Sequence, residues 1–108
     1  MLADLFTILN SITGFKDKVA YRFFPVGQAP ALPFICYEVT ESRNVIGSNT
    51  VIKEVLDVDI DLYSKQKDTA SEGLIESALN TAKIPWNKTE TYIESEQCLM
   101  VTYSITLI

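Results

Sequence analysis

The alternation of apolar and polar residues within the segment from Val51 to Tyr63 most constrains what this chain can fold into. Side chains alternate across a β-strand, so this stretch predicts one long strand with an apolar face and a polar face. The polar face carries a row of aspartates, Asp57, Asp59 and Asp61. Because aspartate is a poor strand former, the row needs a reason, which is chemistry, an assembly surface or solubility.

The rest of the chain predicts two helices and four further strands. Apolar residues recur at helical spacing in residues 2–13 and 68–83. Alternating patterns mark the remaining strands, residues 19–24, 34–40, 86–93 and 97–108. The order α-β-β-β-α-β-β predicts an α+β fold with a mostly antiparallel sheet and both helices packed on one face. At 108 residues, the chain is expected to form a single domain. Glu72 and Glu76 suit the first half of the second helix, where carboxylates interact well with the helix dipole.

A mostly polar segment, residues 41–54, is unusual because its middle carries two apolar residues, Val45 and Ile46. Two interpretations stay open: the pair folds back onto the core, or the segment is an extended hairpin arm with an apolar tip. Glu54 lies on the apolar side of the long strand, which indicates that the strand leaves the core there or contains a bulge. The candidates for an oligomer interface are Val45, Ile46, Asn49 and Glu54.

Residue types that usually carry catalysis are scarce. The chain has no histidine, the commonest general base and metal ligand, and it lacks the sequence motifs of nucleotide-binding, serine-hydrolase and thiol-redox sites. The aspartate row lies on a strand and lacks the glycine and distal glutamate of a calcium loop. We therefore expect no enzyme activity, no metal site and no cofactor. Three uses of the row stay open: an exposed or assembly-facing surface, the lining of a cavity shared by subunits, or a metal-dependent active site.

Charge and hydropathy exclude other classes of function. The net charge is −5 and the basic residues are scattered, which argues against specific nucleic-acid binding. No apolar run approaches the length of a membrane span, and the N-terminal segment lacks the pattern of a signal peptide. Cys36 and Cys98 are therefore expected to be reduced, and a disulfide between them would require neighbouring strands.

Four short segments of the chain carry a resemblance to a known family: PFICYEV (33–39), SRNVIGSN (42–49), VDIDLYSKQKD (58–68) and KTETYIESEQCLMVTYSI (88–105). Together with the order of the elements, they resemble small tail-completion or tail-terminator proteins of long-tailed bacteriophages and prophages of Gram-positive bacteria. The resemblance covers nearly the whole chain.

The resemblance implies a structural virion protein, located in the tail or neck and in the host cytoplasm during assembly. It implies a homo-oligomeric, hexameric ring that caps the tail tube and joins it to the head connector. The partners would be further copies of the chain, the major tail tube protein and the head–tail connector protein. The four interface candidates, Val45, Ile46, Asn49 and Glu54, would then contact the tail or a neighbouring subunit. DNA would pass through the ring, and an acidic lumen lined by the aspartate row would keep it from sticking.

A ring also needs two different complementary edges on each subunit. The hairpin that contains the aspartate row and the final strand are the candidates. Two other functions stay open: another head–tail joining protein, or a small cytoplasmic binding or regulatory module that acts as a homo-oligomer.

Overall fold

The computed structural model of the protein describes residues 2–25 and 27–108. The described residues form two α-helices, α1 (Leu2–Asn10) and α2 (Thr69–Thr81), and a 3₁₀ turn at Glu94–Glu96. A five-stranded sheet comprises β1 (Val19–Tyr21), β2 (Phe34–Ser42), β5 (Leu56–Ser64), β7 (Cys98–Leu107) and β6 (Trp86–Ile93), in that spatial order. A separate two-stranded hairpin comprises β3 (Val45–Gly47) and β4 (Thr50–Lys53).

Antiparallel pairing dominates the large sheet. β1 runs parallel to β2, and the other three neighbouring pairs, β2–β5, β5–β7 and β7–β6, are antiparallel. The predicted α+β class with a mostly antiparallel sheet is therefore confirmed.

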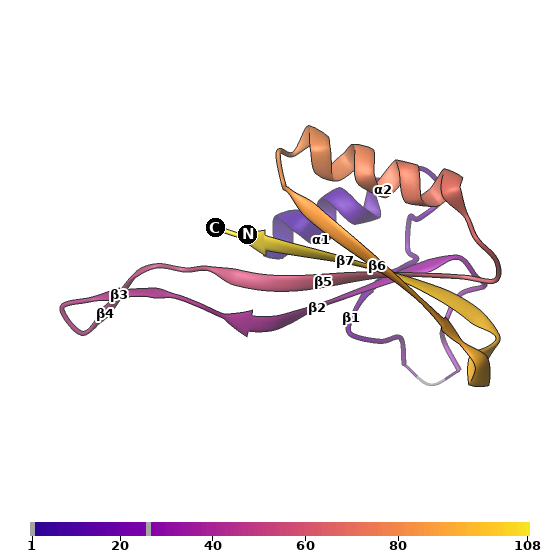
Figure 1. Ribbon diagram of the computed structural model, residues 1–108, viewed down its shortest axis with the longest axis horizontal. Coiled ribbons are helices and arrows are strands. Elements are labelled where there is room, and N and C mark those ends of the chain that lie inside the picture. The colour runs from indigo at the N-terminus through magenta and orange to yellow at the C-terminus, as the bar shows by residue number, and fades with distance from the viewer. Residues whose placement is uncertain (1, 26) are drawn as a thin grey trace.

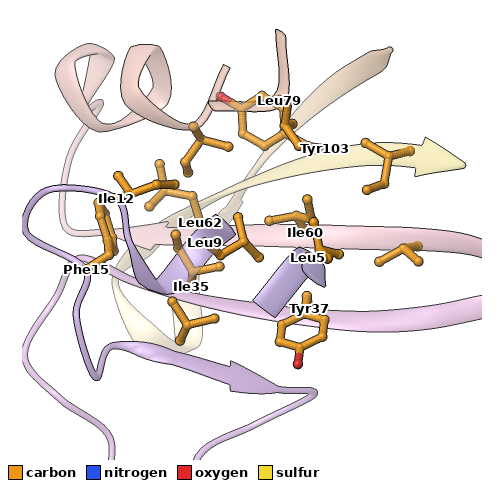
Figure 2. Close-up of a cluster of buried hydrophobic side chains, with 14 of the residues drawn as sticks. Leu5, Leu9, Ile12, Phe15, Ile35, Tyr37, Ile60, Leu62, Leu79 and Tyr103 are labelled. Atoms are coloured by element: carbon orange, nitrogen blue, oxygen red, sulfur yellow. The ribbon is translucent and has the colours of Figure 1, made fainter. Parts of the chain in front are cut away.

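One face of the large sheet forms the core with the two helices, which lie on the same side of it (Figure 1). The apolar face of β5 contributes Val58, Ile60 and Leu62 to this core, and all three are almost completely buried. Figure 2 shows the same cluster, in which side chains from α1, α2 and the strands converge. The helices contribute Leu5, Leu9, Ile75 and Leu79.

The boundaries of α2 have clear local causes. Asp68 caps its N-terminus by accepting hydrogen bonds from the backbone N–H and the hydroxyl of Ser71, at 3.0 and 2.7 Å. At the other end, Lys83 adopts a left-handed φ of +59° and Pro85 follows, so the helix cannot continue. This cap and this stop set the two ends of α2.

The predicted strand from Val51 to Tyr63 is not continuous. It is divided into β4 and β5, and Glu54 and Val55 lie in the break. The reason is a change of partner, because β4 pairs with β3 whereas β5 pairs with β2 and β7. Backbone contacts fix the junction: the Arg43 N–H donates to the Val55 carbonyl at 2.8 Å, and the Val55 N–H donates to Asn44 Oδ1 at 3.1 Å.

Two other predicted elements are longer than the observed ones. The first strand ends at Tyr21 rather than residue 24, because Arg22 adopts a left-handed φ of +68°. The first helix ends at Asn10, and a turn carries the chain on to Phe15, which is buried in the core.

The prediction that the final strand is an edge of the sheet is wrong. β7 lies between β5 and β6, and β5 lies between β2 and β7, so neither has a free side. The edges of the sheet are β1 and β6. The same order places β5 between the strands of Cys36 and Cys98, which are both free thiols. Strands two places apart are roughly 9–10 Å from one another, too far for a disulfide.

Candidate functional site

The hairpin of β3 and β4 projects from the body of the protein beyond β2 and β5 (Figure 1). It exposes four large apolar side chains: the exposed fractions are 49% for Val45, 70% for Ile46, 55% for Val51 and 68% for Ile52. We name this hairpin and its connections, residues 43–55, the arm. Of the two interpretations left open by the sequence, the structure has the extended one, because Val45 and Ile46 do not fold back onto the core.

A tight turn closes the tip of the arm. Gly47 pairs with Thr50, and the two residues between them, Ser48 and Asn49, have left-handed φ values of +50° and +63°. Positive φ at both central positions is the geometry of a type I′ turn, whose twist matches that of the flanking strands. Asn49, an interface candidate in the sequence, therefore has a structural role, because asparagine tolerates this conformation better than most residues.

Gly47 also has a steric role in the arm. A Cβ atom at this position would overlap the Cδ1 atom of Ile52, so the missing side chain lets Ile52 lie across the hairpin. The register shifts between Val45 and Ile46, which leaves one extra residue on β4. The tip of the arm is therefore an ordered hairpin turn and not an irregular polar loop.

Changing Ser48→Asn together with Asn49→Gly should stabilise the arm. Serine is disfavoured at positive φ, whereas Asn-Gly is the preferred sequence of a type I′ turn. We expect a gain of about 1 kcal/mol, which slows amide hydrogen exchange in β3 and β4 about fivefold. Exchange measured by NMR checks this, with the amides of β5 as an internal control. Unchanged exchange in the hairpin would contradict the assignment of the turn.

The base of the arm is tied to the aspartate row. Arg43 donates from Nε and Nη2 to the two carboxylate oxygens of Asp57, at 2.7 and 2.8 Å. Such a bidentate arrangement is the strongest form of an arginine–carboxylate contact. Glu54 lies exposed in the break next to this point. Asp57 is therefore an anchor for the arm as well as a member of the row.

The three aspartates lie on the face of the sheet that is opposite the helices. Each accepts a hydrogen bond from a hydroxyl of β7: Asp57 from Thr106 at 2.9 Å, Asp59 from Ser104 at 3.3 Å and Asp61 from Thr102 at 2.7 Å. Cross-strand pairs of this kind stabilise a sheet and explain how aspartates are accommodated in a strand.

The three carboxylates differ in their electrostatic surroundings. Hydrogen bonds from Arg43 and Thr106 lower the pKa of Asp57 to about 2. Burial raises the pKa of Asp61, although the hydrogen bond from Thr102 opposes this effect. Acidic residues of β2 add to the face, since Glu38 lies opposite Asp59 and Glu41 opposite Asp57. The face is therefore acidic beyond the row itself, and Arg22 offsets it by pairing with Glu38 at 3.2 Å.

The Arg43–Asp57 pair should make stability depend on acidity. The pKa of Asp57 is depressed from an ordinary 3.8 to about 2, so its contribution is present above pH 3.8 and is lost as the pH falls towards 2. We expect Asp57→Asn to remove this part of the acid sensitivity. Urea unfolding at pH 6, 4 and 3 checks this, with Asp59→Asn as the matched control. An Asp57→Asn profile parallel to that of the unchanged protein would contradict the pairing.

One end of the acidic face is covered by aromatic side chains. The ring of Phe34 stacks on Tyr63 at 5.2 Å and meets Phe24 edge-on at 5.3 Å. Cys36 is buried on this face, and burial raises the pKa of its thiol to about 11. Burial likewise raises the pKa of Tyr63 to about 12. Alternation alone does not reveal this cover, because it arises where the chain returns from its proline-rich loop.

A buried ionic network between α2 and β6 was missed by sequence reasoning. Glu72 is 98% buried, and its Oε1 accepts hydrogen bonds from Lys67 and Lys88, both at 3.1 Å. Its Oε2 accepts no hydrogen bond but lies 2.9 Å from Lys67 Nζ. Glu76 accepts from Lys88 at 2.7 Å and from the hydroxyl of Tyr103 at 2.8 Å. Spacing indicates that Glu72 and Glu76 share a helix face, but not that this face meets the sheet.

Within residues 2–25 and 27–108, no group of three or more His, Cys, Asp or Glu side chains is arranged to hold a metal ion. In the same ranges, neither helix combines the length and the apolar character that crossing a membrane would need. Comparison of the chain with family models and with curated proteins found no match to either.

Proposed function

We propose that this chain is a structural virion protein of a long-tailed bacteriophage or prophage. It forms a ring, hexameric by the resemblance, that caps the tail tube and joins it to the head connector. In this role it needs no catalytic residue and no cofactor. Its partners are further copies of itself, the tail tube protein and the connector protein, and its location is the tail or neck of the virion.

The observation that carries this proposal is the exposed apolar surface of the arm. Fully burying one side chain of the size of valine or isoleucine contributes about 1.5–3 kcal/mol, so four half-exposed ones favour association by several kcal/mol. A two-stranded hairpin is only marginally stable by itself in water. A neighbouring protein surface would bury these side chains and stabilise the hairpin at the same time.

The acidic face supports the same role. Each carboxylate of the row accepts a hydrogen bond from a hydroxyl of β7, and Asp57 also accepts hydrogen bonds from Arg43. These bonds fit a structural surface better than a reactive one. In a ring whose lumen carries this face, Asp59, Asp61 and Glu38 would repel the phosphates of passing DNA.

Capping of tail tubes tests the proposal. The major tail tube protein of the proposed virion is polymerised alone and with increasing amounts of the purified chain, and tubes are examined by negative-stain electron microscopy. We expect shorter tubes with a ring at one end. Tubes of unchanged length with no added density at either end would overturn the proposal.

The same assay separates the other open functions. A regulatory module of the cytoplasm would leave the tubes unchanged at every concentration. A head–tail joining protein of a different kind would bind the isolated connector without shortening the tubes. A terminator must do both, because it ends polymerisation and presents a surface to the connector.

A further inference from the structure

The edge strand β6 is long and regular. All eight of its residues pair in sequence with β7 without a bulge, and in the described part of the chain no other strand pairs with it. Natural sheets usually protect such an edge with very short strands, prolines, bulges or charged side chains, lysine above all. The opposite edge has one of these features, because β1 is only three residues long.

The one lysine of β6 is paired within the chain. Lys88 points to the helix side, where its ammonium group is held by Glu72 at 3.1 Å and by Glu76 at 2.7 Å. The outer backbone of β6 is therefore open to a further strand. We propose that its occupant is β6 of a second copy, paired antiparallel across a two-fold axis.

The geometry of an antiparallel pair restricts the register. Alternate residues of an edge strand direct both N–H and C=O outwards, and only these exchange hydrogen bonds with a partner. Two copies of one strand direct the same alternate residues outwards, so a residue can face only another whose number differs by an even amount. The two-fold axis must then pass at a residue and not between two residues.

Charge and the length of overlap together select one residue for this axis, because an axis at Asn87 or Thr91 pairs at most five of the eight residues of β6. An axis at Lys88 places two lysines opposite each other, and an axis at Glu90 places two glutamates opposite each other, and both arrangements are unfavourable. An axis at Thr89 places Lys88 opposite Glu90 of the second copy, and Glu90 opposite Lys88.

The remaining positions agree with the axis at Thr89. On the helix side, Trp86 faces Tyr92 of the second copy, and aromatic pairs of this kind stabilise neighbouring strands. On the acidic side, Asn87 faces Thr91 of the second copy, so two polar side chains meet. The sequence WNKTETY is thus complementary to itself when read in the opposite direction.

The side chains retain capacity for these contacts. Lys88 uses two of its three donors within the chain, and Glu90 accepts one hydrogen bond, from Lys67 at 2.6 Å. A strand edge buries less area than a standard interface of roughly 1,600 Å², so we expect a weak dimer with a dissociation constant of roughly tens of micromolar.

This inference does not rest on the proposed ring. A ring joins different surfaces of neighbouring subunits, whereas the β6 pair joins the same surface of two copies. Variants of β6 therefore test the pair, and variants of the arm test the ring, so that failure of one can be distinguished from failure of the other.

The experiment introduces a charge at the two-fold axis. Thr89 is exposed and faces itself in the pair, so Thr89→Lys places two positive charges opposite each other. We expect sedimentation equilibrium, from about 5 µM to about 500 µM, to give a dissociation constant at least about tenfold higher than that of the unchanged chain. Thr89→Glu should weaken the dimer in the same way, and an equimolar mixture of the two variants should dimerise again.

Thr91→Lys is the matched control. It adds the same charge on the same face of β6, but in this register it meets Asn87, so the dissociation constant should change less than about twofold. Circular dichroism verifies that each variant is folded. The proposal is overturned if the unchanged chain is monomeric throughout the range, if Thr91→Lys weakens the dimer as much as Thr89→Lys, or if the mixture stays monomeric.

Discussion

Replacing Lys67 and Lys88 by methionine should lower the free energy of unfolding by about 3 kcal/mol, because it leaves a buried carboxylate without a cation. Glu72 is 98% buried, and within the described residues its carboxylate forms ion pairs with these two lysines. Glu76 loses one partner too, but it keeps the hydroxyl of Tyr103 and reaches water. Urea unfolding followed by circular dichroism measures the change.

The matched control adds Glu72→Met to the same double variant. Replacing a buried ionic group and its partners by apolar side chains of similar size is often neutral, so most of the lost stability should return. Recovery in the triple variant identifies the uncompensated charge of Glu72 as the cause. If the double variant is as stable as the unchanged protein, the network does not hold α2 on the sheet.

This network also marks a limit of sequence reasoning. The periodicity of α2 predicts the helix, and the alternation of β7 predicts its buried face, on which Tyr103 is fully buried. The contact of Glu72 with Lys88 joins residues 16 positions apart through the crossing of α2 over β6. No local pattern encodes that crossing, so a carboxylate that suits a helix N-terminus is indistinguishable from one that is ionically paired in the core.

The aspartate row shows a similar division. Alternation correctly predicts that Asp57, Asp59 and Asp61 share the face of β5 opposite the core. It does not reveal that each aspartate has a hydroxyl partner on β7, because this depends on the register between strands some 40–50 positions apart. The position of Glu54 on the apolar side does indicate where the strand leaves the core, and the break lies there. Alternation does not reveal that the pairing partner changes at this point.

The arm should be required for capping but not for folding. We expect Ile46→Lys combined with Ile52→Lys to abolish the ring on tail tubes, because charged side chains would replace the two most exposed apolar ones of the arm. The free energy of unfolding should change by less than about 0.5 kcal/mol, since neither side chain contributes to the core. Tube length and end density in negative-stain images give the first result, and urea unfolding gives the second.

Ile108→Lys is the control for this test. Ile108 is 68% exposed, as is Ile52, but it lies at the end of the chain outside the arm. The variant makes the same chemical change at an equally exposed isoleucine, so it should cap tubes as well as the unchanged chain. Capping by the arm variant would show that its apolar surface is not the contact, whereas loss of capping by both variants would show a general effect of added charge. Loss confined to the arm variant would assign the contact to the hairpin, because the fold and the change in charge per residue would be the same in both proteins.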